Sequence, residues 1–204
     1  NVSGNLTSTN SGTSLAVDND TNDRNIYVTG NVSIGVGTTL SASSSGTFEV
    51  GGNWANSGTF TDNTGTVTFD ATDTDNTLTG TMTGSSEFGT IVFNGSGGQW
   101  SINNNLEADE DIQVDDNVTG NGTINLSGGT FTVVNGSNTF GGDTGWTFNN
   151  VWFDQAGTGT KTTSAAGTGS ITITGTLTLD AVYNAVGGYY DSHELEAGSK
   201  DWYL

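Results

Sequence analysis

The stretch SGTFTDNTGTVTFDAT, from Ser57 to Thr72, holds two short alternations of apolar and polar residues, TFT and TVTF, almost back to back. Each alternation is opened by Gly-Thr, and only a few small polar residues stand between the two. A period of two residues is typical of a short β-strand with one apolar face and one polar face. The stretch therefore predicts two consecutive strands joined by a tight corner.

The same motif, Gly-[Thr/Ser]-apolar-x-apolar, recurs along the chain. Its copies are GTFEV from Gly46, GTVTF from Gly65, GTIVF from Gly89, GTINL from Gly122, GTFTV from Gly129, GSITI from Gly169 and GTLTL from Gly175. A longer similarity aligns FGTIVFNGSG, from Phe88, with FNNVWFDQAG, from Phe148, without a gap. The chain thus carries a repeat of about 60 residues built from shorter strand-turn units, which indicates a solenoid or an array.

These patterns predict an all-β fold, a parallel β-solenoid of short irregular rungs. In such a coil glycine permits corners with positive φ, threonine suits the water-facing side of a strand, and asparagine bonds its own backbone and stacks at corners. The absence of proline agrees with backbone N–H groups that all pair with a neighbouring rung. The alternative is a set of tandem antiparallel β-sandwich modules, which also read as short strands separated by turns. Very short gaps between strands weigh against it.

Composition restricts the partners of the chain. The 204 residues carry a net charge of −19, because 22 acidic residues face only Arg24, Lys161 and Lys200. Coulomb repulsion excludes binding to nucleic acid or to an anionic membrane, and the same charge attracts cations. No apolar run approaches the roughly 20 residues that span a bilayer, so no membrane insertion is expected. An acidic composition rich in Asn, Thr and Gly favours an extracellular, cell-surface location, whereas the absence of Cys says little about the compartment.

Three segments are expected. Residues 1–24 form an N-terminal cap or strand-donating segment, residues 25–186 form the solenoid repeats, and residues 187–204 form an aromatic-rich C-terminal cap or inter-subunit segment. The last segment is predicted to bind a partner through four aromatic residues, Tyr189, Tyr190, Trp202 and Tyr203. A solenoid leaves an open strand edge at each end, which a chain must either cover or pair with a neighbour.

The stretch GGNWANSGTFTDNTGTVTFDAT (51–72), followed by FGTIVFNGSG and later TGTLTLDA, resembles the Gly/Thr/Asn-rich β-helix repeats of large bacterial and archaeal cell-surface proteins. The likeness covers most of residues 25–181. It implies an extracellular β-helix stalk of the S-layer-like or adhesin-like kind, often one piece of a longer chain. It implies no catalytic residues, so none is carried over.

Calcium is the cofactor that the acidic clusters suggest. Asp18, Asp20 and Asp23 stand in DNDTND, Asp70, Asp73 and Asp75 stand in DATDTD, and a third cluster is EADED, at 107–111. Hard carboxylate oxygens one or two residues apart in a loop are the ligands that calcium prefers. The complete EF-hand and nonapeptide calcium patterns are absent. Solvated turns, with Asp as a turn former, are the alternative for each cluster.

No enzyme is predicted. His193 is the single histidine and has no partner motif for a catalytic triad, and three scattered basic residues do not suit a lyase. We therefore expect an extracellular structural protein, a subunit or module of a surface layer, stalk or fibre. It would self-associate, or join neighbouring modules of the same surface protein, through end-to-end or strand-donation β contacts. The alternative is an adhesin-type module that binds glycans through exposed aromatic residues. The tryptophans that could stack on sugar rings are Trp54, Trp100, Trp146 and Trp152.

Overall fold

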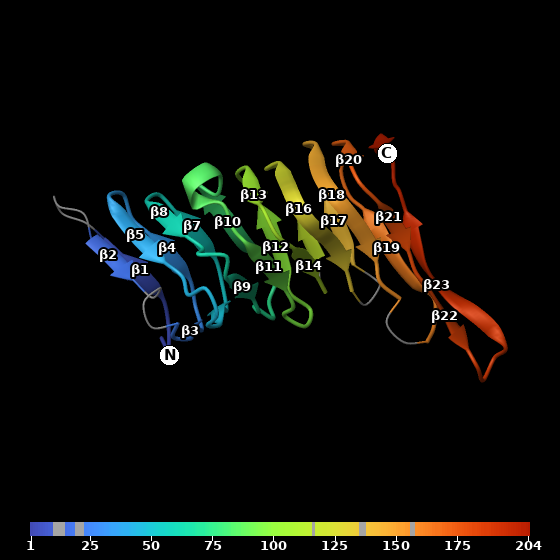
Figure 1. Cartoon of the computed structure of the whole chain (residues 1–204), viewed down its shortest axis with the longest axis horizontal. Coiled ribbons are helices and arrows are strands. Elements are labelled where there is room, and N and C mark those ends of the chain that lie inside the picture. The colour runs from blue at the N-terminus through green and yellow to red at the C-terminus, as the bar shows by residue number, and fades with distance from the viewer. Residues whose placement is uncertain (10–14, 19–22, 116, 135–137, 156–157) are drawn as a thin grey trace.

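The computed structural model describes residues 1–9, 15–18, 23–115, 117–134, 138–155 and 158–204. They form a parallel β-solenoid that is elongated along one axis, with the N-terminus at one end and the C-terminus at the other (Figure 1). Apart from the single 3₁₀ turn η1 (Gly84–Ser86), the regular elements of these residues are strands. The predicted solenoid is confirmed.

Each turn of the coil has up to three sides. Side 1 is a ten-stranded sheet made, in order, of β1 (Leu6–Ser8), β4 (Val32–Ile34), β7 (Trp54–Asn56), β10 (Asn76–Gly80), β12 (Gln99–Ile102), β15 (Asn117–Thr119), β17 (Thr139–Gly141), β19 (Lys161–Ala165), β23 (Tyr189–Glu196) and β22 (Ala181–Asn184).

Side 2 starts as a three-stranded sheet, is interrupted by η1, and continues along one half of an eleven-stranded sheet. Its strands are β2 (Leu15–Asp18), β5 (Thr38–Ser41), β8 (Thr59–Thr61), β13 (Leu106–Ala108), the first halves of β16 (Ile124–Val133) and β18 (Trp146–Phe153), β20 (Ile171–Ile173) and β24 (Trp202–Tyr203).

Side 3 is the other part of the eleven-stranded sheet. Its strands are β3 (Ile26–Val28), β6 (Phe48–Val50), β9 (Thr66–Phe69), β11 (Thr90–Phe93), β14 (Ile112–Val114), the second halves of β16 and β18, and β21 (Leu177–Leu179). A change of register between Leu126 and Thr130 bends β16 from one side to the other.

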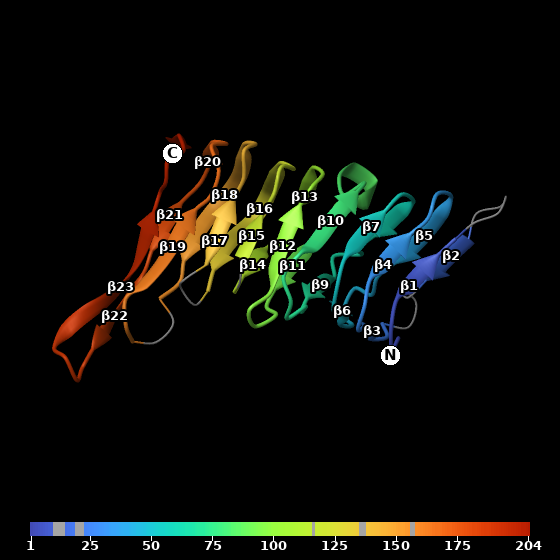
Figure 2. The same cartoon turned by 180° about the vertical axis from the view of Figure 1, so that it is seen from behind.

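Strand direction decides between the two predicted folds. Every strand pair in the described residues is parallel except β22 with β23, which form an antiparallel hairpin. That hairpin projects from the C-terminal end of the coil (Figures 1 and 2). The alternative of tandem antiparallel β-sandwich modules is therefore wrong.

An apolar ladder runs the length of side 3. One residue from each turn stands in register with its neighbours, namely Val2, Val28, Val50, Phe69, Phe93, Val114, Val133, Phe153 and Leu179. Successive members are 19 to 26 residues apart, so the rungs are irregular, as predicted. On side 2, Phe88 reaches Phe148 through Ala108 and Leu126. The repeat of about 60 residues therefore spans three turns of the coil.

The core is narrow and combines aliphatic side chains with two clusters of aromatic rings. Trp54 lies at the centre of one cluster, with ring centroids 4.9 Å from Phe60 and 5.4 Å from Phe88. A second cluster stacks Phe131 on Phe148 at 4.4 Å. All five side chains are buried. Burying one such ring contributes about 1.5–3 kcal/mol, so these aromatic clusters add substantially to the stability of the core.

Glycine opens each copy of the repeated motif for a different reason from the one predicted. Of the seven motif glycines, only Gly129 has a positive φ, of 40°. At Gly65 a Cβ atom would stand 2.1 Å from the carbonyl oxygen of Ser43, and at Gly169 it would stand 1.8 Å from that of Thr144. These carbonyls belong to the preceding turn. The glycines are thus required by close packing between rungs rather than by backbone conformation.

The terminal segments join the coil. In residues 1–24, β1 and β2 pair in parallel with β4 and β5 and form part of the first turn. In residues 187–204, β23 pairs with β19 and β24 pairs with β20. The chain therefore keeps adding strands to sides 1 and 2 beyond residue 186.

Candidate functional site

The acidic residue Asp23 joins two turns of the coil. Its Oδ1 atom accepts hydrogen bonds from the hydroxyls of Ser43, at 2.7 Å, and Ser44, at 3.0 Å, and from the backbone N–H of Ser45. These bonds lower the pKa of Asp23 to about 2. Of its two predicted calcium-binding companions, Asp20 lies outside the described residues. Asp18 is the last residue of β2 and pairs with Ser41.

The three aspartates of the second predicted calcium cluster lie in different local environments. Asp70 follows β9 and lines a shallow cavity of about 250 Å³ on side 3, together with Glu49. Burial, and then the charge of Asp70, raise the pKa of Glu49. Asp73 accepts a hydrogen bond from Asn76 Nδ2 at 2.9 Å, and Asp75 lines a different cavity on side 1. The three carboxylates stand beside different partners.

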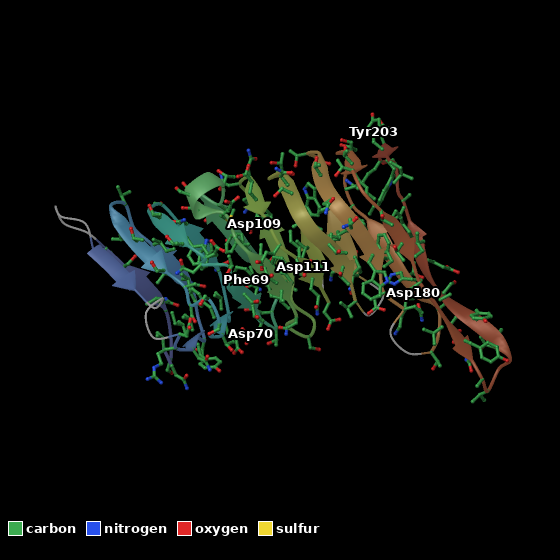
Figure 3. The ribbon with its side chains drawn as sticks, viewed as in Figure 1. Phe69, Asp70, Asp109, Asp111, Asp180 and Tyr203 are labelled. Atoms are coloured by element: carbon green, nitrogen blue, oxygen red, sulfur yellow. The ribbon has the colours of Figure 1, made fainter. Side chains whose placement is uncertain are left out.

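The third cluster is used mainly to connect neighbouring turns. Glu107 accepts a hydrogen bond from the Gly84 N–H, Glu110 accepts one from the hydroxyl of Thr90, and Asp111 accepts one from the N–H of Thr130. In Figure 3, Asp70 lies at the lower edge of the coil and Asp109 lies well above it. Nearby, burial and then the charges of Asp109, Glu107 and Asp62 raise the pKa of Glu87.

In the part of the chain that the structure describes, no group of three or more His, Asp or Glu side chains is placed to hold a metal ion. The side chains at 15–22 are outside that statement. Calcium binding therefore stays a prediction for the two clusters at 18–23 and 70–75.

Asparagine side chains form a second kind of ladder, along the corners. Asn5 Oδ1 accepts a hydrogen bond from the N–H of Asn31 at 2.9 Å, Asn31 Oδ1 accepts one from Asn53 at 2.8 Å, and Asn53 Oδ1 accepts one from Thr77 at 2.6 Å. Asn117 repeats the contact with Thr139 further along, at 2.7 Å. At these corners a side-chain carbonyl supplies the acceptor for a backbone N–H of the next turn, so neighbouring turns stay hydrogen-bonded where the strands end.

Of the four aromatic residues predicted to bind a partner, one covers the last turn of the coil and three are exposed. Trp202 packs on the last turn, with its ring centroid 6.1 Å from that of Phe140, and it donates a hydrogen bond to the Ala197 carbonyl. Tyr189 and Tyr190 are 56% and 69% exposed on the projecting hairpin. Tyr203 is 55% exposed at the C-terminal tip of the coil (Figure 3).

Two polar residues that the sequence does not mark as structural help to close the C-terminal end. Lys200 is only 8% exposed, and its Nζ donates to the carbonyls of Gly142, at 2.8 Å, and Gly169, at 2.9 Å. Burial lowers the pKa of Lys200, although the charge of Asp143 opposes that effect. The buried His193 contacts the hydroxyl of Thr163 through Nε2 at 2.7 Å and the carbonyl of Asp154 through Nδ1 at 3.0 Å.

The tryptophans suggested as sugar platforms are mostly core residues. Trp54, Trp100 and Trp146 are each 1% exposed or less. Trp152 is 38% exposed on the outer face of β18, between the buried Val151 and Phe153, and lies beside a shallow cavity. The outward aromatic residues are therefore Trp152, the tyrosines of the hairpin and Tyr203.

No family model, curated protein or solved structure matches this chain significantly. Among the described residues, no helix is long and apolar enough to cross a membrane. The fold is thus defined by the structure itself as a parallel β-solenoid, and the resemblance to cell-surface repeats stays a prediction.

Proposed function

We propose that this chain is an extracellular structural module, part of a surface layer, stalk or fibre, which extends by adding β-strands at the ends of its coil. One observation carries the proposal: the sheets run along the long axis of the molecule and end in strands with a free edge. At the N-terminal end, β1 and β2 are the outermost strands of their sheets among the described residues. Such an edge presents unpaired N–H and C=O groups to another strand.

The hydrogen bonds between turns support a role in which the coil resists stretching. Hydrogen bonds between successive turns are made by the strands, by the corner asparagines and by Asp23. Because these bonds are directed along the axis of the coil, many of them together oppose its extension. The stability of such a coil is the sum of similar turns and the contacts between them. The outward faces are polar and acidic, which keeps separate coils apart except at their ends.

Electron microscopy of the purified chain, with millimolar calcium and again with a chelator, tests this proposal. Ordered filaments or sheets support a self-assembling structural module, and their loss in the chelator supports a role for calcium at the acidic clusters. Dispersed single particles under both conditions contradict autonomous assembly and leave a stalk module within a larger protein or a glycan binder.

A second function, glycan binding of the adhesin type, is favoured by one feature. Tyr183 and Tyr190 lie 5.2 Å apart between ring centroids on the projecting hairpin, and both are more than half exposed. Exposed aromatic rings stack on the apolar faces of sugars. Glycan-array binding that is lost in Tyr190→Ala and kept in Trp152→Ala would assign this function to the hairpin. Loss in Trp152→Ala alone would assign it to side 3.

A further inference from the structure

Trp152 stands on the outer face of side 3, at a position that the coil does not need to fill with a large side chain. The same outward position in the three preceding turns is held by Thr132, Gln113 and Val92. Trp152 is 38% exposed, whereas Val151 and Phe153 on either side of it are buried. These two core residues fix the strand, so the indole is held outward without being part of the core.

The indole of Trp152 is flanked by a threonine on each neighbouring turn. Thr132 of β16 and Thr178 of β21 both pair in register with Trp152 of β18. These three strands lie side by side in the C-terminal half of the coil (Figure 1). Since paired strands are about 4.8 Å apart, the two hydroxyl groups stand close to the ring on both of its sides.

A second row of polar side chains runs parallel to the first, two residues earlier on each strand. In this row Asn150 pairs with Thr130 on β16. Its Oδ1 accepts a hydrogen bond from the backbone N–H of Thr176 at 3.0 Å, and its Nδ2 donates one to the carbonyl of Gly129 at 3.1 Å. The amide of Asn150 is therefore held by both neighbouring turns and braces the surface beside the indole.

The two rows enclose a shallow cavity of about 420 Å³, which falls within the roughly 300–1,000 Å³ of small-ligand sites. The described residues that line it are Thr130, Asn150, Val151, Trp152, Thr176 and Thr178, and none of them is charged. The hydroxyls of Thr130, Thr176 and Thr178 make no hydrogen bond to another described residue. Each of these hydroxyls can therefore both donate to a ligand and accept from it.

We propose that this surface, formed by Trp152 and the hydroxyls of Thr130, Thr176 and Thr178, binds an uncharged sugar of a glycan. The inference rests on the second function proposed above, glycan binding, and gives it a site on the coil and a class of ligand. A sugar ring has an apolar face that stacks on an indole, and its rim of hydroxyl groups matches the threonine hydroxyls around that indole.

Charge and area select an uncharged sugar over other occupants. The net charge of −19 repels an anionic polysaccharide, and no carboxylate among the lining residues is placed to pair with a cationic ligand. A single half-exposed indole among hydroxyl groups also offers little apolar area, whereas a stable protein interface buries about 800 Å² on each partner. A small ligand with one apolar face and a polar rim fits this surface best.

A glycan array tests the class of ligand. The array carries uncharged hexose and N-acetylhexosamine oligosaccharides, together with uronate-containing and sulfated ones. The wild-type chain should bind uncharged members and leave the anionic ones unbound. Isothermal titration calorimetry with the uncharged oligosaccharide that binds most strongly on the array then gives the Kd for the wild type and its variants.

Four variants test the site. Trp152→Ala should raise the Kd about tenfold or more, because the stacking area is lost, whereas Trp152→Phe keeps a ring and should retain most of the affinity. Thr178→Val replaces one hydroxyl by a methyl group of similar shape and should raise the Kd about three- to tenfold. Thr68→Val is the matched control, since Thr68 holds the same outward position on β9, away from the cavity. Circular dichroism checks that all four variants keep the sheet content of the wild type.

The outcomes separate this site from the function on which it rests. Binding of uncharged glycans that weakens in Trp152→Ala and Thr178→Val, and stays unchanged in Thr68→Val, supports the inference. Equal effects of Thr178→Val and Thr68→Val, or a preference for anionic glycans, overturn it. Binding that survives Trp152→Ala and is lost in Tyr190→Ala also overturns it and leaves glycan binding to the hairpin.

An empty array overturns the site and glycan binding together, and it leaves the structural module standing. If self-association of the chain then weakens in Trp152→Ala, the indole belongs to a contact between copies of the chain instead of a sugar site.

Discussion

Replacing Gly169 by alanine tests the explanation of the repeated glycine. A Cβ atom at this position would lie 1.8 Å from the carbonyl oxygen of Thr144 in the preceding turn, and that neighbour is backbone. A tolerable contact needs at least 3.0 Å, so the two turns must separate locally by about 1.2 Å, a quarter of the roughly 4.8 Å between paired strands.

The size of the effect follows from the contacts that this separation strains. Overpacking by one methyl group costs about 1–3 kcal/mol. The separation also strains the hydrogen bond from Gly169 N–H to Gly142 and the one from Lys200 Nζ to the Gly169 carbonyl. Each such bond contributes about 1 kcal/mol, of which the strain removes about half, so we expect a total loss of about 2–4 kcal/mol in the free energy of unfolding. For a chain of this length that loss lowers Tm by roughly 5–15 °C.

Gly145→Ala is the matched control. Gly145 likewise precedes a strand and has no positive φ. A Cβ atom there would lie 3.1 Å from the hydroxyl of Ser170, which can rotate away, and at an ordinary 3.8 Å from the Ser170 carbonyl oxygen. The loss of unfolded-state entropy is the same in both variants and cancels in their difference. Urea titration followed by circular dichroism measures both. Unfolding free energies within about 0.5 kcal/mol of each other would refute the argument from close packing between turns.

Three further predictions concern single contacts. Asn53→Ala should lower the unfolding free energy by about 1–2 kcal/mol, because the N–H of Thr77 loses its acceptor, whereas Asn53→Asp keeps the acceptor and most of the stability, as urea titration would show. In the same assay Trp146→Phe should cost about 1 kcal/mol more than Trp54→Phe, because only the indole N–H of Trp146 has a hydrogen-bond partner; equal costs would contradict this. Since the pKa of Asp23 is lowered to about 2, its stabilisation is complete above pH 3.8 and is lost as the pH falls through about 2. Unfolding titrations should therefore show Asp23→Asn less stable than the wild type at pH 5, with the difference shrinking toward pH 2.

The strands that have a clear alternation of apolar and polar residues were predicted correctly from the sequence. All seven copies of the Gly-[Thr/Ser] motif form strands, and all seven lie in the eleven-stranded sheet. The strands of side 1 were harder to find. Segments such as β7 (WAN) and β15 (NVT) are three residues long and hold one large apolar residue each, so their periodicity is too short to be distinctive.

Residues whose role depends on the neighbouring turn escaped prediction. Gly169 is required by the backbone of Thr144, and the sequence does not say which residue lies one turn earlier when turns vary in length. Lys200 is nearly buried, although a lysine in a polar tail suggests a solvated side chain. Its two carbonyl partners come from the ends of two earlier turns. Asn53 could be anticipated as a corner residue, but its particular partner, Thr77, could not.

Net charge makes the ionic conditions decisive for any test of assembly. With a charge of −19 on each copy, stacking two ends brings like charges together, and the repulsion is screened over about 10 Å at 0.1 M salt. Calcium can therefore promote assembly in two ways, by binding carboxylates such as Asp70 at a site or by screening. A comparison of calcium with sodium chloride at the same ionic strength distinguishes binding at a site from screening. If calcium binds at a site, filaments should form in millimolar calcium and not in sodium chloride of the same ionic strength, and Asp70→Asn or Asp73→Asn should raise the calcium concentration needed. Equal assembly in both salts would instead show that screening suffices, and it would remove calcium from the mechanism of assembly.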